Sequence, residues 1–307
     1  MLRSKPSAAI LLLLVFAGCQ ARPQPLTLAL MGDLMLGRGV AQAYPDGDLA
    51  PALTAAQAYL QDADLALTNL ESPLTSKHLP PSDYNLCAAP AALPSLLRAG
   101  FDILTLANNH QDDCAPGGAA QTASLLQDAG LAPVPPSIQS PPLYLPCQQW
   151  LCAVIAFDDI TAPLDPAAAQ GVIAGAAERA DIVIVSVHWG TEYAPAPTQR
   201  QRALAGAFAD SGADLIFGHH PHVLQPVEWL QGAGQPHPTL VAYSLGNALF
   251  DQSPPDARRT ALLQVALTPA GVQSVHAVPL VISLPGWQLT PATGKDEARI
   301  LERLNLP

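Results

Sequence analysis

The sequence predicts an α/β fold built around a largely parallel sheet. Short runs rich in Val, Ile or Leu alternate with helix-like stretches through the first two-thirds of the 307 residues. Such runs are typical of strands buried on both faces, and strand–helix alternation is the pattern of parallel sheets. The chain is 49% apolar, which supplies a large core and excludes global disorder.

The expected elements follow one another in a regular order. Strand-like runs cover residues 26–31, 64–68, 101–106, 152–157, 181–187 and 213–217. The helix-like stretches between them are residues 50–62, 91–99, 117–129, 166–179 and 198–211. The last third, closer to a β layer, has strand-like runs at 239–244, 260–268 and 272–283. Residues 133–146 hold six prolines and are interpreted as a rigid loop within one domain, because candidate site residues occur on both sides.

The charge balance excludes one class of partner. Lys and Arg number 14 against 25 Asp and Glu, giving a formal net charge of -11. Such a chain lacks the general basic surface that binds the phosphates of nucleic acid. We therefore expect no nucleic-acid partner, and an anionic ligand would need a metal ion or local arginines such as Arg38, Arg200 and Arg202.

The N-terminus has the pattern of an export signal. Arg3 and Lys5 precede an apolar run at 8–16, which is too short to span a bilayer as a helix and is followed by small residues and Cys19. The segment ending in Cys19 resembles the lipobox of bacterial lipoproteins, which implies cleavage before this cysteine and its lipidation. The alternative is ordinary secretion with cleavage near Ala17 or Ala21.

Lipidation at Cys19 would divide the chain into three parts. We expect a signal peptide at 1–18, a lipidated cysteine and tether at 19–25, and a single domain at 26–307. The protein would then be exported and lipid-anchored to a bacterial membrane, at its periplasmic face. Because Gln20 replaces the Asp that often retains lipoproteins in the inner membrane, the outer membrane is favoured in a Gram-negative host.

The other four cysteines are disulfide candidates: Cys87, Cys114, Cys147 and Cys152. An even set in an exported protein suggests disulfides. Cys147 and Cys152 flank four residues, which suits a hairpin, and Cys87 would then pair with Cys114; the sequence does not choose among the three pairings. A four-cysteine zinc site is disfavoured, because no two cysteines have the C-x2-C spacing.

Polar side chains follow the ends of the predicted strands. They are Asp33, Asn69, Glu71, Asn108, Asn109, His110, His188, Glu192, His219, His220 and His222. Ligands of open α/β sheets bind outside the carboxyl ends of the strands. Carboxylates, amides and imidazoles form a mixed nitrogen and oxygen set that suits Mn, Fe or Zn.

Each motif also has an alternative without catalysis. The Gly-Asp at residue 33 is common in turns and helix caps, Asn-Asn-His occurs in turns, and His188 could be a satisfied core histidine. The three histidines within residues 219–222 are harder to explain structurally. His220 and His222 can share one ion if the backbone bends locally around Pro221.

Six ordered blocks resemble the CapA family of bacterial capsule and poly-γ-glutamate synthesis proteins, which are related to calcineurin-like metallophosphoesterases. The blocks read MGDLMLGR, TNLESPLT, LTLANNHQDD, VHWGTEY, FGHHPHVLQPVE and YSLGNALFD, and the resemblance covers residues 27–285. It implies a metallophosphatase-like four-layer α-β-β-α sandwich with one or two divalent metal ions.

The resemblance also implies roles for individual residues. The metal ligands would be Asp33, Asn69 or Glu71, Asn109, His188, His220 and His222. In the implied hydrolysis, a hydroxide shared by two ions attacks phosphorus, His110 protonates the leaving group, and Glu192 orients the site or acts as a base. The residues expected to contact substrate or close the pocket are Arg38, His219, Asn247 and Asp251.

One departure from related phosphoesterases bears on the number of ions. Those enzymes open with Asp-x-His, whereas Asp33 is followed by Leu34 and Met35, so one ligand is missing. In the same block as His110, Asp113 fits the pattern of the CapA family.

Two functions from different classes are compatible with these residues. The first is a metal-dependent hydrolase that cleaves a phosphoester or related envelope bond in the synthesis of capsule or a poly-γ-glutamate-type exopolymer. The second is a non-catalytic polymer-binding or assembly and export subunit that retains the fold. The expected partners are an anionic envelope polymer or a phosphoester substrate, an exopolymer synthesis complex, and the membrane through the lipid anchor.

Overall fold

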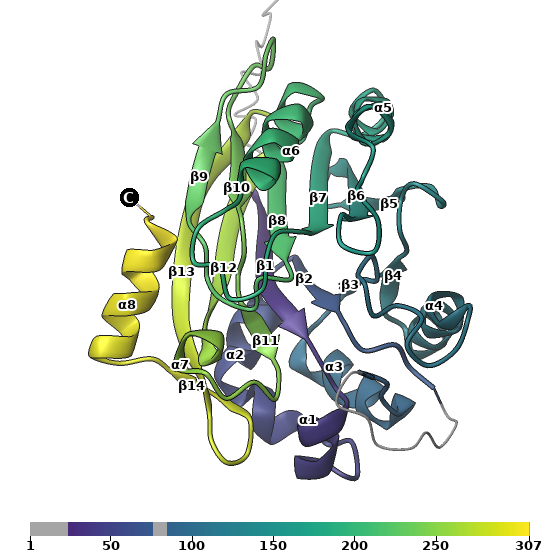
Figure 1. Ribbon diagram of the computed structural model, residues 1–307. Helices are drawn as coiled ribbons and strands as arrows, with labels where there is room; N and C mark the ends of the chain where they lie inside the picture. The colour runs from purple at the N-terminus through teal and green to yellow at the C-terminus, as the bar shows by residue number, and fades with distance from the viewer. Residues whose placement is uncertain (1–23, 76–84, 307) are drawn as a thin grey trace, which may run out of the picture.

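The computed structural model describes residues 24–75 and 85–306, and in them two sheets lie face to face between helices (Figure 1). The strands of the first sheet are β1 (Leu26–Leu34), β2 (Leu65–Leu70), β3 (Ile103–Thr105), β4 (Ala132–Val134), β11 (Asn247–Leu249), β12 (Arg259–Thr268), β13 (Gly271–Ser283) and β14 (Gln288–Pro291). Those of the second sheet are β5 (Leu143–Cys147), β6 (Trp150–Asp158), β7 (Ile182–His188), β8 (Leu215–His219), β9 (Val227–Leu230) and β10 (Thr239–Ala242).

The first sheet has the order β14-β13-β12-β1-β2-β3-β4, with β11 paired to β1, and the second has the order β5-β6-β7-β8-β10-β9. β1 to β4 run parallel, as do β6, β7, β8 and β10, so each sheet has a parallel centre. The helices are α1 (Arg38–Ala43), α2 (Ala50–Asp62), α3 (Leu93–Ala99), α4 (Gly118–Ala129), α5 (Pro166–Ala177), α6 (Gln199–Asp210), α7 (Pro255–Arg258) and α8 (Lys295–Leu304).

β1 shows how an apolar run becomes a central strand. Successive side chains of a strand point to opposite faces. Leu28 and Leu30 therefore pack between the two sheets, whereas Ala29 and Met31 pack toward the helices. Both faces are buried, which explains the absence of a polar alternation in this run.

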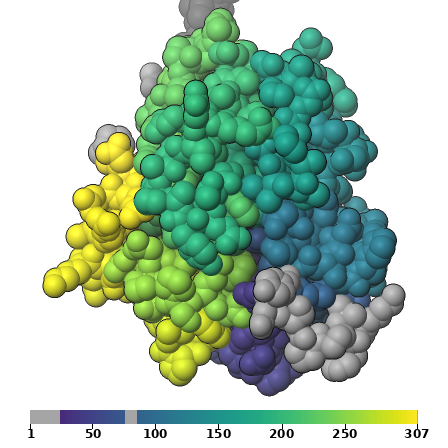
Figure 2. Space-filling view, viewed as in Figure 1, coloured from purple at the N-terminus to yellow at the C-terminus, as the bar shows by residue number. Residues whose placement is uncertain are grey.

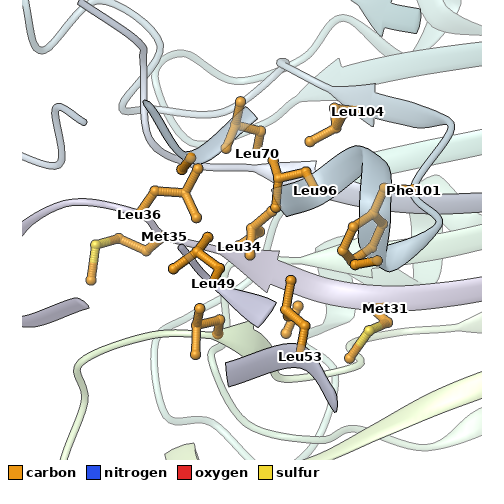
Figure 3. Packing of buried hydrophobic residues seen from close by; sticks show 14 of the residues in the cluster. Met31, Leu34, Met35, Leu36, Leu49, Leu53, Leu70, Leu96, Phe101 and Leu104 are labelled. Atoms are coloured by element: carbon orange, nitrogen blue, oxygen red, sulfur yellow. The ribbon is translucent and has the colours of Figure 1, made fainter. Parts of the chain in front are cut away.

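Three hydrophobic cores separate the layers. The first joins the first sheet to α2, α3 and α4, and Figure 3 shows Leu34 of β1 lying among Leu49, Leu70 and Leu96 in this core. The second fills the space between the sheets, and the third joins the second sheet to α5 and α6. This arrangement confirms the predicted α-β-β-α sandwich.

The proline-rich segment at 133–146 is the crossover between the two sheets. It begins in β4 and ends in β5, so the interpretation of the whole segment as a loop was wrong at both ends. β4 and β5 are edge strands of their sheets, where a proline such as Pro133 or Pro146 breaks no continuous ladder.

Several short or polar elements were not predicted. They are α1, β9, β11, α7, β14 and α8. α8 buries Ile300 and Leu304 against the core between the sheets and lies along one flank of the molecule, drawn in yellow in Figures 1 and 2. The remaining residues of α8 are mostly polar, so the helix gave no apolar run to detect.

Both proposed disulfides are formed. Cys147 and Cys152 close the β5–β6 hairpin, and Cys87 pairs with Cys114. The predicted signal peptide, the lipidated Cys19 and most of the tether lie outside the described residues. Within residues 24–75 and 85–306, no helix is long and apolar enough to cross a membrane.

Candidate metal centre

The candidate site lies where strands of both sheets end. In the first sheet Asp33 of β1 is in register with Asn69 of β2, and in the second His188 of β7 is in register with His219 of β8. The asparagine Nδ2 donates to Asp33 Oδ1 at 2.8 Å and lies 3.4 Å from His188 Nδ1, which joins the two sheets. The expectation that strand ends would gather these side chains is met for both sheets.

Asp33 is a buried carboxylate that accepts two hydrogen bonds and lies close to two imidazoles. His219 Nδ1 lies 3.2 Å from Oδ1, and His222 Nδ1 lies 3.4 Å from Oδ2. The backbone N–H of His220 also donates to Oδ2, at 2.9 Å. Burial alone would raise the pKa of Asp33, but the close imidazoles of His219 and His222 hold that pKa well below its usual range. Asp33 is therefore ionised and sets the arrangement of the histidine loop.

Glu71 is buried with neither carboxylate oxygen hydrogen-bonded to any described residue. Its Oε1 lies 3.7 Å from His188 Nε2 and 3.8 Å from both His222 Nε2 and His110 Nε2. Burial and the nearby charge of Asp33 raise the pKa of Glu71 well above its usual value. A buried carboxylate without hydrogen bonds is costly, so this side chain indicates a missing partner.

The backbone bends at His220 and His222, which is the condition under which both side chains could bind one ion. Both have positive φ values, 89° and 56°, on either side of Pro221. Such values are uncommon outside glycine and often mark functional sites. The bend brings one ligand atom each of Glu71, His220 and His222 within 4.8 Å of one another.

The histidines differ in their charge state. Burial lowers the pKa of His188 well below its usual value and that of His220 to about 4, so both are neutral and able to bind a metal. Burial also opposes charge on His222, but the negative charges of Glu71 and Asp33 raise its pKa to about 9. His222 would therefore release a proton when it binds a cation.

The donor set fits a divalent metal. Within the described residues, the buried ring nitrogens of His219 and Nδ1 of His220 lack hydrogen-bond partners, as do both oxygens of Glu71. Imidazole and carboxylate ligands suit Zn, Mn or Fe. Glu71, His220 and His222 would hold the ion, with His188 and Asp33 alongside.

The predicted amide ligands make other contacts. Oδ1 of Asn69 accepts a hydrogen bond from Asn108 Nδ2 at 3.1 Å, and Oδ1 of Asn109 lies 2.8 Å from His188 Nε2. In this arrangement Asn69 orients Asp33, and Asn109 orients His188. Asn108 also donates to the Leu70 carbonyl and was absent from the predicted ligand set, although the Asn-Asn-His motif contains it.

His110, the predicted acid, lies at the rim of this cluster. Its Nδ1 is 2.9 Å from Asp113 Oδ2, and its Nε2 faces Glu71 at 3.8 Å. Glu192, its predicted companion, is exposed in the loop after β7, and its charge contributes to the raised pKa of Glu71. The contact between Asp113 and His110 depends on how this turn folds, so the sequence motif alone did not predict it.

The residues predicted to bind substrate make contacts within the protein. Arg38 forms an ion pair with Asp251, whose Oδ2 also accepts the Gly39 backbone N–H at 2.8 Å. Asn247 Oδ1 lies 3.0 Å from His222 Nδ1, so Asn247 positions that imidazole. His219 is buried beside Asp33 and directly precedes the candidate ligand His220.

The other arginines considered for anion binding are also paired. Arg200 contacts Asp159 at 2.5 Å, and Arg202 contacts Glu228 at 2.8 Å. All three arginines considered for anion binding are therefore paired with carboxylates.

Sequence comparison connects this site to known proteins. Residues 27–252 match the family model described as bacterial capsule synthesis protein PGA_cap. The chain is 31% identical to the capsule biosynthesis protein CapA of Bacillus anthracis, over 92% of this chain and 73% of that protein. The chain belongs to the bacterial capsule synthesis (CapA) family. It is also 30% identical to the PGA biosynthesis protein CapA of Bacillus subtilis (strain 168), over 89% of this chain and 75% of that protein.

Solved structures confirm the fold of this CapA family member. A hypothetical protein from Thermus thermophilus has a TM-score of 0.55 at 16% identity, covering 82% of this chain and 98% of its own. A structure described as a novel phosphatase from Mycoplasma pneumoniae has a TM-score of 0.54 at 16% identity, covering 84% and 94%. The similarity establishes a shared fold, and at 16% identity it carries no conclusion about chemistry.

The family match includes every candidate site residue from Asp33 to Asp251. Met35 occupies the place of the second ligand in Asp-x-His and is buried, with its Sδ accepting the Gly37 N–H at 3.0 Å. This CapA family member therefore has a thioether, hydrogen-bonded to the backbone, at the position of the histidine in Asp-x-His.

Proposed function

We propose that the chain is a metal-dependent hydrolase of a phosphoester or related cell-envelope bond, acting in the synthesis of a capsule or poly-γ-glutamate-type exopolymer. The observation that carries the proposal is Glu71. Its buried carboxylate has no hydrogen-bond partner in the described chain and faces ring nitrogens of His110, His188 and His222. A cation bound among these atoms would give the buried carboxylate the partner that it lacks.

A bound divalent ion supplies Lewis-acid polarisation of the substrate and lowers the pKa of water. The residues of the chain do the remaining work. Asp33 holds the histidine loop through the His220 N–H, and Asn109 holds the ring of His188. His110, at the rim, keeps Nε2 toward the cluster and is placed to give a proton to a leaving group.

The link to exopolymer synthesis rests on relatives. The Bacillus proteins are named for capsule and PGA biosynthesis. An anionic polymer would meet an acidic protein in which Arg38, Arg200 and Arg202 are paired with carboxylates. The metal centre is then the main source of attraction for an anionic group.

The proposal is tested by metal analysis of the full chain together with a phosphodiester assay using bis(p-nitrophenyl) phosphate and added Mn²⁺. We expect His220→Ala with His222→Ala to lose bound metal, and turnover to fall by at least about 100-fold. His276→Ala is the control, because His276 is exposed on β13 outside the cluster. A chain that binds no metal would contradict the ligand assignment.

The second candidate is a non-catalytic polymer-binding or assembly subunit. The observation that favours it is the buried Met35 in place of a ligand. Metal bound in wild-type protein without turnover of any phosphoester would support this candidate over the hydrolase.

A further inference from the structure

The imidazole of His110 lies in a turn that has little regular structure of its own. The turn connects the end of β3 at Thr105 to the start of α4 at Gly118. Within it, the Asp113 N–H donates to the His110 carbonyl at 3.0 Å. No helix or strand ladder fixes the orientation of the His110 ring, so side-chain contacts must do so.

Asp113 supplies one such contact. Its Oδ2 lies 2.9 Å from His110 Nδ1 and accepts the Leu86 backbone N–H, also at 2.9 Å. A carboxylate at Nδ1 favours the tautomer that carries its proton there. His110 Nε2 is then the ring atom presented to Glu71 and to the metal cluster.

The Cys87–Cys114 disulfide joins the two segments that carry Leu86 and Asp113. Cys114 follows Asp113 directly, and Cys87 follows Leu86 directly. The Asn85 side chain also donates to the Asp113 carbonyl at 3.2 Å. The disulfide thus joins the two segments one residue away from the hydrogen bond between Leu86 and Asp113.

The segment that carries Cys87 is hydrogen-bonded to the part of the chain that follows Glu71. Ala88 N–H donates to the Pro73 carbonyl at 3.0 Å, and Thr75 N–H donates to the Ala88 carbonyl at 2.9 Å. Pro73 lies two residues after Glu71. A continuous set of contacts therefore runs from Glu71 through the disulfide to Asp113 and His110.

The second disulfide provides a contrast. Cys147 and Cys152 are five positions apart in sequence and close a hairpin whose strands are already paired, whereas Cys87 and Cys114 are 27 positions apart. Loss of the hairpin disulfide leaves a hydrogen-bonded ladder in place. Loss of Cys87–Cys114 releases an irregular turn that carries a site residue.

We propose that the Cys87–Cys114 disulfide holds the Asp113 carboxylate against Nδ1 of His110 and so keeps the His110 ring directed at Glu71. The acid role of His110 rests on the proposed function, while the orientation of its ring does not. Reduction of this disulfide would uncouple His110 from the cluster without removing any metal ligand.

The test compares four forms of the full chain: wild type, Asp113→Asn, Cys87→Ala with Cys114→Ala, and Cys147→Ala with Cys152→Ala. The tautomer of His110 is read from its ¹⁵N ring shifts after histidine labelling, with His110→Gln for assignment. We expect a fixed Nδ1–H tautomer in wild type and the hairpin variant, and averaged shifts in the other two. Turnover of bis(p-nitrophenyl) phosphate should fall about 10- to 100-fold in those two, with unchanged KM and metal content.

An unchanged His110 tautomer in Asp113→Asn and in the Cys87–Cys114 variant would overturn the proposal, as would equal effects of the two disulfides. If the Cys87–Cys114 variant does not fold, Asp113→Asn keeps both disulfides and decides the role of Asp113. A wild-type chain without turnover would refute the hydrolase, while the tautomer comparison would still decide this inference.

Discussion

Glu71 is a buried carboxyl group without a hydrogen-bond partner among the described residues. Burial and Asp33 raise its pKa, so ionising Glu71 at pH 7 costs free energy in the folded, metal-free protein. Because the folded value lies above the unfolded one, this cost is absent at low pH and grows as pH rises.

Glu71→Gln should therefore stabilise the metal-free protein at pH 7 and remove stabilisation by metal. A metal at 100 times its Kd stabilises a protein by about 2.7 kcal/mol, which is roughly 5–10 °C in Tm for a domain of this size. Thermal unfolding in EDTA and in Mn²⁺ measures both effects, with the exposed Glu178→Gln as control. An equal response of wild type and Glu71→Gln to Mn²⁺ would contradict the assignment.

Asp214 offers a pH-dependent prediction away from the metal centre. It accepts the Val183 N–H at 2.7 Å and lies 3.3 Å from His237 Nε2. Burial raises its pKa to about 6. The folded chain thus holds a proton that the unfolded chain releases, so the stability from this group is largest at low pH and is lost as pH rises through about 6.

Between pH 4 and 6.5, the free energy of unfolding should change less in Asp214→Asn than in wild type, because asparagine does not titrate. The difference between the two changes should be at most about 3 kcal/mol. Urea unfolding at several pH values measures this slope. Asp181→Asn is the matched control, because Asp181 also accepts a backbone N–H but is exposed. A wild-type slope in Asp214→Asn would refute the prediction.

At the scale of residues, the sequence predicted which side chains lie at the site better than it predicted which side chains contact one another. Asp33, His188, His220 and His222 were found because each follows an apolar run, and strand ends converge. The pairing of Arg38 with Asp251 spans 213 residues and depends on how two loops fold, which no local pattern encodes.

At the scale of elements, glycines set how closely the strands of the site approach other segments. A Cβ added to Gly218 of β8 would lie 2.1 Å from the Tyr243 carbonyl oxygen and 2.4 Å from Trp189 Nε1. In contrast, Gly171 in α5 has open space where a Cβ would be added.

Gly218→Ala should destabilise the protein by about 1–3 kcal/mol or more, because backbone must shift. It should also weaken metal binding by moving His219, the next residue. Gly171→Ala should instead stabilise by about 0.5–1 kcal/mol, because alanine restricts the unfolded chain and favours helix. Urea unfolding of both variants tests the contrast, and similar stabilities would contradict it.

Elements with long apolar runs were predictable, and short ones were not. The range predicted for α2 matches the structure, and β6, β7 and β8 were found with shifts of one or two residues at their ends. β11 has three residues and forms only because Asn247 is in register with Asp33 across a parallel pair. Its existence depends on tertiary contacts, so the sequence around it carries no strand pattern.

At the scale of the whole molecule, attachment to a membrane remains a prediction from the N-terminal sequence. We expect the full chain, expressed in a bacterium that processes lipoproteins, to fractionate with membranes and to carry acyl groups on Cys19. Cys19→Ser should release it into the soluble exported fraction. Mass spectrometry of the mature N-terminus measures this, and cleavage near Ala17 or Ala21 without acylation would refute the anchor.

The four-layer architecture was predictable only through the family resemblance. Strand–helix alternation indicated one parallel sheet, whereas the structure divides its strands between two mixed sheets. Both arrangements bury apolar runs on two faces, so hydrophobicity alone does not distinguish them.

The ligands that would hold a metal begin at Asp33 and end at His222, and they come from both sheets. A nascent or half-folded chain therefore offers an ion only scattered side chains. Because most sites of this chemistry follow the same order of intrinsic affinity among metals, local supply strongly influences which ion is taken. We therefore expect the identity of any bound metal to follow the metal supply of the compartment in which the two sheets come together, so that protein folded in a different compartment would carry a different ion.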